Sequence, residues 1–131
     1  MSHKFTVRIY YEDTDLAGIV YYANYLKFIE RARSEWVREL GVDQVAMKAD
    51  GLVFAVRRVE ADYLAPARFD DLIRVQTSVA RLTGSRIVLT QDVMRDTELL
   101  FGSIVTLVCL AETGKPARIP ADIRAKMQPH T

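Results

Sequence analysis

Three acidic side chains, Glu12, Asp13 and Asp15, lie ahead of an apolar and aromatic stretch in YYEDTDLAGIVYYANY, residues 10–25. A carboxylate held in a poorly hydrated loop beside a helix terminus can act as a general base or as a nucleophile. Asp15 is the strongest candidate, because residues 16–20 behind it are apolar and predict its desolvation. Helix capping or loop hydrogen bonding is the alternative for these acids, since a helix dipole stabilises carboxylates near its N-terminus.

The start of the following helix supplies the second half of a candidate site. Asp15 precedes this helix by too many residues to be an ordinary N-cap. Backbone N–H groups near Tyr22 and Ala23 lack intrahelical partners, so they could hold a carbonyl oxygen as it becomes negative. Gly18 allows the intervening backbone to turn sharply or to approach a ligand closely. An acid beside such an oxyanion site suits acyl transfer to water.

The sequence gives little support for other kinds of catalytic site. The two histidines, His3 and His130, lie near the termini, where chains are usually mobile, so no catalytic imidazole is expected. The single cysteine, Cys109, lies in the apolar run TLVCLA and predicts a buried hydrophobe rather than a nucleophile. Zinc-ligand spacing, a phosphate-binding loop and a dinucleotide-binding glycine pattern are all missing from the sequence, so neither a metal nor a cofactor is expected.

The composition is typical of one globular domain. The chain has 131 residues, 50% of them hydrophobic, and a formal net charge of +1, which predicts a single domain over residues 1–131. A basic excess or basic block that would indicate a nucleic-acid partner is not found. The start of the chain lacks an apolar signal core, and no run reaches the length of about 20 apolar residues that crossing a bilayer requires. We therefore expect a cytoplasmic protein without integral membrane association.

Periodicity predicts the elements that must position these residues. Residues 4–11 alternate as a strand, and residues 23–40 carry a single apolar helical stripe. Gly41 follows this stripe and predicts a left-handed cap. A short helical turn is expected within 42–50 and a closing helix over 121–127. The other expected strands cover 52–64, 72–82, 86–94 and 99–110. Because most connections are too short for parallel crossovers, the sequence predicts an α+β domain with an antiparallel sheet that could curl around the helix.

The stretch YYEDTDLAGIVYYANYLKFIERARSEWVRELG closely resembles the signature of the hotdog-fold acyl-CoA thioesterases, in particular the YbgC-like branch of the 4-hydroxybenzoyl-CoA thioesterase family. FAVRRVEADYLAPARFDDLIRV and TGKPARIP resemble later family segments more loosely. The resemblance implies a curved five-stranded antiparallel sheet wrapped around one long helix, in a homodimer that commonly pairs into a homotetramer. It also implies hydrolysis of short-chain aliphatic or aromatic acyl-CoA to free acid and coenzyme A, without a cofactor, at a site on the dimer interface.

The resemblance assigns roles to individual residues. The family's motif places the catalytic carboxylate on Asp15, as general base or nucleophile, and the oxyanion donor on the backbone N–H of Tyr22. Tyr25 lies near the site in relatives, although core packing also accounts for it. Phe54 and Ala55 resemble the segment that the partner subunit contributes to the pocket. In YbgC-like members a histidine typically stands at position 22 and a Gly-Gly pair at 17–18; the tyrosine resembles the 4-hydroxybenzoyl-CoA branch instead.

A coenzyme A substrate carries phosphates, which implies a cationic rim. The candidate cations, which could also be ordinary solvated side chains, are Arg57, Arg58, Arg81, Arg86, Lys115 and Arg118. A module that binds acyl-CoA or acyl carrier protein without cleaving it is the second interpretation. A dehydratase of the same fold is the third, and it is disfavoured because such sites generally use histidine.

Overall fold

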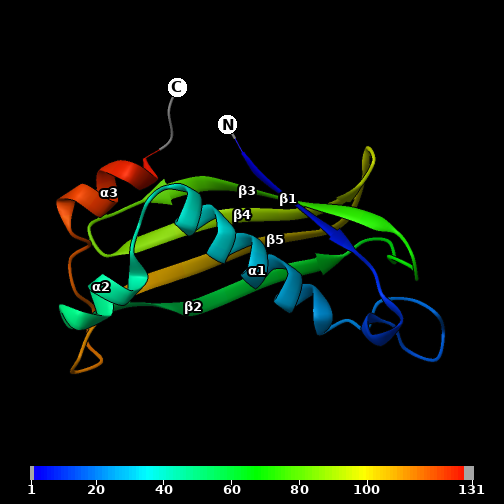
Figure 1. Cartoon of the computed structure of the whole chain (residues 1–131), viewed down its shortest axis with the longest axis horizontal. Coiled ribbons are helices and arrows are strands. Elements are labelled where there is room, and N and C mark those ends of the chain that lie inside the picture. The colour runs from blue at the N-terminus through cyan, green and yellow to red at the C-terminus, as the bar shows by residue number, and fades with distance from the viewer. Residues whose placement is uncertain (1, 129–131) are drawn as a thin grey trace.

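The strands of this computed structural model, which describes residues 2–128, form one antiparallel sheet in the order β1-β3-β4-β5-β2 (Figure 1). Their bounds are β1 (His3–Arg8), β2 (Leu52–Tyr63), β3 (Leu72–Leu82), β4 (Arg86–Arg95) and β5 (Glu98–Ala111). The expected α+β class and the expected strands are confirmed. The first strand ends at Arg8 rather than Tyr11, because Tyr11–Asp13 form a 3-10 turn, η1.

The long helix α1 (Asn24–Glu39) lies across one face of the sheet (Figure 1). Its apolar stripe is buried as the period predicts, through Tyr25, Phe28, Ile29, Ala32, Trp36 and Val37. Gly41 has a φ of +80°, the left-handed conformation expected after the helix. Two shorter helices, α2 (Gln44–Ala49) and α3 (Ala121–Met127), lie toward the opposite end of the molecule from the acidic segment (Figure 1).

A buried polar contact fixes how α1 sits on the sheet. The side chain of Gln91, which is fully buried in β4, donates through Nε2 to the carbonyl oxygen of Ile29 and to Oγ1 of Thr77, both at 2.9 Å. Arg33 Nη1 donates to Gln91 Oε1 at 2.8 Å. Because a buried amide is costly to leave unsatisfied, these bonds select one rotation of the helix and thereby the position of its N-terminus.

Strand β2 forms one edge of the sheet, and its side chains are exposed along most of its length. Val56 and Tyr63 are each 49% exposed, and Val53 and Val59 are more than a third exposed. A long apolar edge strand offers unpaired backbone groups to another chain and is usually covered in native proteins.

Two sequence expectations concern residues outside the acidic segment. Cys109 is buried, and burial raises the pKa of its thiol, which agrees with an inert hydrophobe. The expectation of a mobile terminus is wrong for His3, which pairs with Thr77 in the sheet and lies 2.9 Å from Glu39 through Nε2. His130 lies outside the described residues. Within residues 2–128, no helix is both long and apolar enough to cross a bilayer.

Candidate active site

The acidic segment folds into a tight hairpin that leads into α1. The N–H of Asp15 donates to the carbonyl oxygen of Ile19 at 2.9 Å, and the N–H of Gly18 donates to that of Asp15 at 3.0 Å. Gly18 has a φ of +78°, so the sharp turn expected at this glycine is confirmed. The hairpin therefore folds Asp15 back against Ile19, three residues before Tyr22.

Asp13 has a structural role in this hairpin. Its Oδ2 accepts the N–H of Tyr10 at 2.8 Å, and its carbonyl oxygen accepts the N–H of Tyr21 at 3.0 Å. The same carbonyl oxygen accepts the side-chain amide of Asn24 at 2.9 Å, which ties the hairpin to the first residue of α1. Glu12 is exposed. Loop hydrogen bonding, rather than chemistry, thus accounts for Asp13.

Asp15 is more hydrated than its apolar neighbours predict. Its Oδ1 accepts the N–H of Ala17 at 2.9 Å, but the residue is exposed. Leu16 is fully exposed at the tip of the hairpin, and Ala17 and Gly18 are exposed as well. The expected desolvation is therefore wrong for the single subunit, because residues 16–18 are exposed and Val20 is buried in the core instead of covering the carboxylate.

The start of α1 carries unpaired backbone donors. The N–H of Tyr21 is used within the hairpin, and the N–H of Asn24 donates to Tyr21 at 2.8 Å. Between them, the N–H groups of Tyr22 and Ala23 have no acceptor among residues 2–128. Two adjacent free donors at a helix N-terminus are suited to hold a negatively charged oxygen.

A cavity of about 320 Å³ opens beside these donors. Its walls are apolar and aromatic, and they consist of Ile19, Val20, Tyr22, Tyr25, Tyr63, Leu64, Ala65 and Pro66. The cavity thus joins the end of the hairpin, the start of α1 and the end of β2 in one place.

Tyr63 is a residue of this site that the sequence analysis did not single out. Its hydroxyl donates to the carbonyl oxygen of Tyr22 at 3.0 Å. Burial raises the pKa of the Tyr63 hydroxyl, and the nearby Tyr22 hydroxyl raises it further, so the group stays protonated and remains a donor. The one feature of the sequence that could have indicated Tyr63 is its place at the end of a predicted strand, shortly before Ala65 and Pro66.

Tyr25 both lines the cavity and belongs to the core. It is 3% exposed, and its ring stacks on Phe101 with centroids 5.0 Å apart. Its hydroxyl oxygen accepts the N–H of Ala67 at 3.0 Å. Burial raises the pKa of Tyr25, although the bond from Ala67 opposes the shift. The two interpretations of Tyr25 are therefore compatible.

Phe54 and Ala55 are not brought to this cavity within the subunit. The strand register pairs Phe54 with Cys109, whereas Tyr63 pairs with Phe101. At ~3.3 Å per residue, Phe54 and Tyr63 lie roughly 30 Å apart along β2. Phe54 and Ala55 therefore cannot reach the cavity at the other end of this strand within one chain.

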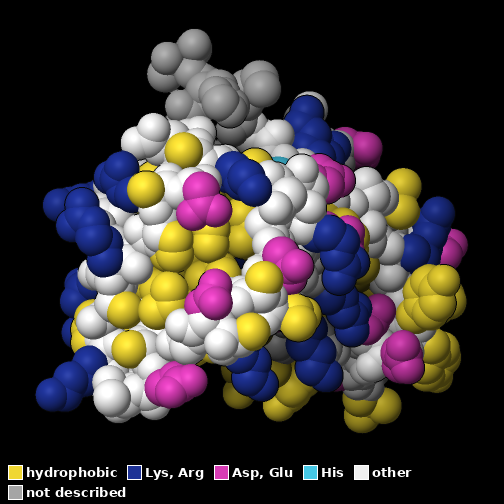
Figure 2. All heavy atoms as spheres, turned by 60° about the vertical axis from the view of Figure 1, so that its left-hand side comes forward, with side chains coloured by type: hydrophobic (Ala, Val, Ile, Leu, Met, Phe, Trp, Pro, Cys, Tyr) yellow, Lys and Arg dark blue, Asp and Glu magenta, His cyan; other side chains and the backbone are white. Residues whose placement is uncertain are grey.

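The predicted cations are also remote from the cavity. Arg86 begins β4 and pairs with Val108, toward the end of the sheet that carries Phe54. Arg118 lies over Gly84 in the turn before β4, where a Cβ would come within 3.4 Å of Arg118 Nη1. The end of the molecule carrying α2 and α3 faces forward in Figure 2, where Lys and Arg side chains gather along one edge. Arg81 lies near the end of β3, before the same turn, and Lys115 lies in the turn after β5. Arg57 and Arg58 lie in the middle of β2, and Arg58 pairs with Glu60 at 3.0 Å.

Comparison with known proteins places these features among enzymes that cleave thioesters. Residues 17–101 match the profile of a family described as the thioesterase superfamily. The acyl-CoA thioester hydrolase YbgC of Escherichia coli O6:H1 is 39% identical over 127 residues, which cover 95% of this chain and 95% of that protein. The acyl-CoA thioesterase YbgC of Haemophilus influenzae is 40% identical over 125 residues, 93% of this chain and 91% of that protein.

A solved structure has the same architecture. The crystal structure of a probable thioesterase from Bartonella henselae matches with a TM-score of 0.85 and 37% identity, covering 92% of this chain and 100% of that one. Within residues 2–128, no group of three His, Cys, Asp or Glu side chains is placed to hold a metal ion.

Proposed function

The chain belongs to the thioesterase superfamily and is a thioesterase with the hotdog fold, and we propose that Asp15 and the start of α1 form its catalytic site for acyl-CoA hydrolysis. The observation that supports this assignment is the hairpin that folds Asp15 back against Ile19, three residues before Tyr22, because the unpaired N–H groups of Tyr22 and Ala23 lie beside a cavity that Ile19 also lines. An acid and an oxyanion site are the two parts that thioester hydrolysis requires.

In the proposed reaction, the thioester carbonyl oxygen accepts the N–H of Tyr22. Asp15 then either takes a proton from an attacking water or attacks the carbonyl carbon itself, forming a mixed anhydride that water cleaves. In both routes the carbon–sulfur bond breaks, the coenzyme A thiolate leaves and is protonated, and the free acid is released. Negative charge develops on the carbonyl oxygen, so losing one donor typically costs about 3 to 4 kcal/mol in the barrier.

We propose a short-chain aliphatic or aromatic acyl group as the substrate's acyl part, on the basis of the cavity. Its volume of about 320 Å³ and its apolar, aromatic walls suit a compact acyl chain or a single ring. Acyl carrier protein as an alternative carrier of the acyl group, and a cytoplasmic location, stay predictions.

We extend the proposal to a homodimer that pairs through β2. A two-fold axis at the middle of this exposed edge strand would place two copies of β2 antiparallel. Phe54 of the partner subunit would then lie toward the end of β2 that carries Tyr63 in this one, with Arg86 and Arg118 of the partner subunit nearer the cavity. Such a surface could also cover the exposed Asp15 hairpin. A homotetramer of two such dimers stays a prediction.

Asp15→Asn tests the assignment. The amide has the same size and can still accept the N–H of Ala17, so fold and ligand binding should persist while turnover falls by orders of magnitude. Turnover is followed with a thiol reagent over a panel of acyl-CoA esters. Glu12→Gln, which neutralises an exposed acid of the same segment, is the control and should behave as wild type. Unchanged turnover of Asp15→Asn rejects the assignment, and binding without thiol release by the wild type favours the non-hydrolytic module.

A further inference from the structure

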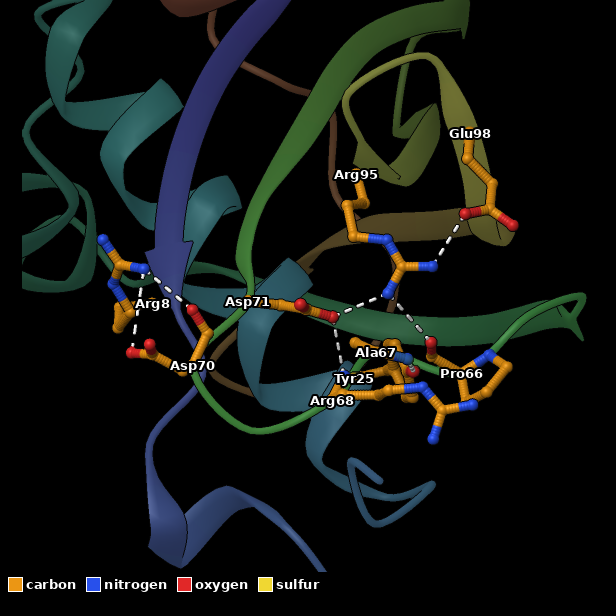
Figure 3. Close-up of polar contacts among 9 residues, drawn as sticks. All are labelled: Arg8, Tyr25, Pro66, Ala67, Arg68, Asp70, Asp71, Arg95 and Glu98. Carbon is orange, nitrogen blue, oxygen red and sulfur yellow. Dashed lines mark hydrogen bonds and ion pairs between the residues drawn. The ribbon is translucent and has the colours of Figure 1, made fainter. Parts of the chain in front are cut away.

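The connection between β2 and β3 is held by an ion pair from the end of β4 (Figure 3). Arg95 Nη1 donates to Asp71 Oδ2 at 2.6 Å and to the carbonyl oxygen of Pro66 at 3.3 Å. Asp71 Oδ2 also accepts the N–H of Arg68 at 2.8 Å. Arg95 therefore contacts both ends of the segment 66–71 and closes it into a compact loop.

The same loop holds both halves of the candidate site. The carbonyl oxygen of Ala67, a fully buried residue, accepts the N–H of Val20 at 2.8 Å, and Arg68 pairs with Ile19 in an antiparallel bridge. On the other side, the N–H of Ala67 donates to the hydroxyl of Tyr25 at 3.0 Å. One peptide segment thus connects the end of the Asp15 hairpin to the first turn of α1.

The ion pair is partly withdrawn from water. The side chains of Arg95 and Asp71 are 27% and 23% exposed, and Arg95 Nη2 also donates to Glu98 at 2.7 Å. Burial raises the pKa of Asp71, but the N–H of Arg68 and the Arg95 guanidinium outweigh burial and lower it overall. Asp71 is therefore ionised at neutral pH. Removing one member of such a pair leaves the other charge partly buried, which disturbs a structure more than breaking an exposed pair does.

We propose that the Asp71–Arg95 pair is a positioning device for the catalytic hairpin. Through Ala67, it sets the position of Asp15 relative to the N–H groups at the start of α1. This inference rests on the proposed function, which requires that fixed geometry. Neither Asp71 nor Arg95 lines the cavity, so both act through the loop rather than on the substrate.

The neighbouring acid provides a matched control. Asp70 faces Arg8, whose Nη1 lies 3.8 Å from Asp70 Oδ1 and donates to its carbonyl oxygen at 2.8 Å. This pair is far more exposed, at 48% and 77%, and neither of its members is hydrogen-bonded to Ala67. Asp70 has a φ of +71°, a conformation that asparagine tolerates. Asp70→Asn and Asp71→Asn therefore remove the same charge at adjacent positions, and only Asp71→Asn weakens the Asp71–Arg95 ion pair.

The experiment combines kinetics with hydrogen exchange. We expect Asp71→Asn and Arg95→Gln each to lower kcat by about tenfold while KM changes by less than about twofold, since small displacements of catalytic groups lower rates steeply. The kcat of the double variant should be no lower than that of the poorer single variant, because both substitutions disrupt the same ion pair. Asp71→Glu, which keeps the charge, should recover part of kcat. Hydrogen exchange should become faster in a peptide covering residues 15–22, and Asp70→Asn should match wild type in both measurements.

Two results overturn the inference. One is an Asp71→Asn variant that loses thermal stability but keeps wild-type kcat and wild-type exchange in residues 15–22, which makes the pair a fold stabiliser only. The other is an equal loss of kcat in Asp70→Asn. If Asp71→Asn is insoluble, Arg95→Lys gives the same readout. Lysine keeps the charge, but it lacks the planar guanidinium that bonds Asp71 through Nη1 and Glu98 through Nη2. A wild type without activity refutes the proposed function and this inference together, whereas an active wild type with an equally active Asp71→Asn refutes this inference alone.

Discussion

Tyr63→Phe removes a single hydrogen bond at the start of α1. The lost hydroxyl donates to the carbonyl oxygen of Tyr22 at 3.0 Å. The remaining ring keeps its contacts with Tyr25 and Phe101, whose centroids lie 5.5 and 5.0 Å away. The substitution therefore separates the hydrogen bond from the packing of the cavity wall.

The expected effect on stability is small. A hydrogen bond of this kind contributes about 0.5 to 1.5 kcal/mol to the free energy of unfolding. Tyr63 is 49% exposed and Tyr22 is 62% exposed, so water can replace the hydroxyl. The loss should lie near the lower limit, about 0.5 kcal/mol.

The expected effect on catalysis is larger than the effect on stability. The carbonyl of Tyr22 follows the proposed donor, the N–H of the same residue, so the bond from Tyr63 restrains the backbone on one side of that donor. Losing this restraint should raise the barrier by about 1 kcal/mol, which lowers kcat by about fivefold. KM should change less, because the cavity wall is intact.

Steady-state kinetics on an acyl-CoA ester, with a thermal unfolding curve for each variant, tests this expectation. Tyr21→Phe is the matched control, since Tyr21 is an exposed neighbour whose hydroxyl has no partner among residues 2–128. A Tyr63→Phe enzyme with wild-type kcat would refute the reasoning, and so would an equal loss in Tyr21→Phe.

Two further predictions concern acid stability and assembly. The lowered pKa of Asp71 contributes stability that is fully present above its ordinary value of 3.8 and is lost as the pH falls toward the folded value. The difference in unfolding free energy between wild type and Asp71→Asn, measured with denaturant, should therefore shrink below about pH 4; a constant difference contradicts this. Val56→Arg on β2 should shift the protein toward monomer in sedimentation experiments and lower activity, whereas Val45→Arg, at an 82% exposed position on α2, should not; an unchanged dimer rejects pairing through β2.

The fold could be predicted from the sequence because its signals are local. The helical period over residues 23–40 and the alternation over residues 72–82 each record which face is buried. The structure follows both patterns, with α1 buried along its stripe and Ile73 and Val75 facing the core. Short connections then leave an antiparallel sheet as the only arrangement.

The surroundings of the candidate site could be predicted only in part. The hairpin and the helix start form one continuous segment, so the sequence alone suggests a site that combines Asp15 and Tyr22, and their roles stay predictions. Desolvation of Asp15 was wrongly expected, because apolar composition does not reveal whether a second surface covers a loop. Tyr63 and Asp71 were missed because their partners are distant in sequence: Tyr63 and Tyr22 are 41 residues apart, and Asp71 and Arg95 are 24 apart.

The candidate catalytic segment depends on anchors that lie outside it. Gln91 sets the rotation of α1, Tyr63 holds the carbonyl at its start, and Ala67 joins the hairpin to its first turn. Each anchor meets a backbone group or a hydroxyl of the segment, so the residues there can vary in side chain while the geometry persists. The side chain at position 22 can therefore vary, because the proposed donor is the backbone N–H of Tyr22 and not its side chain.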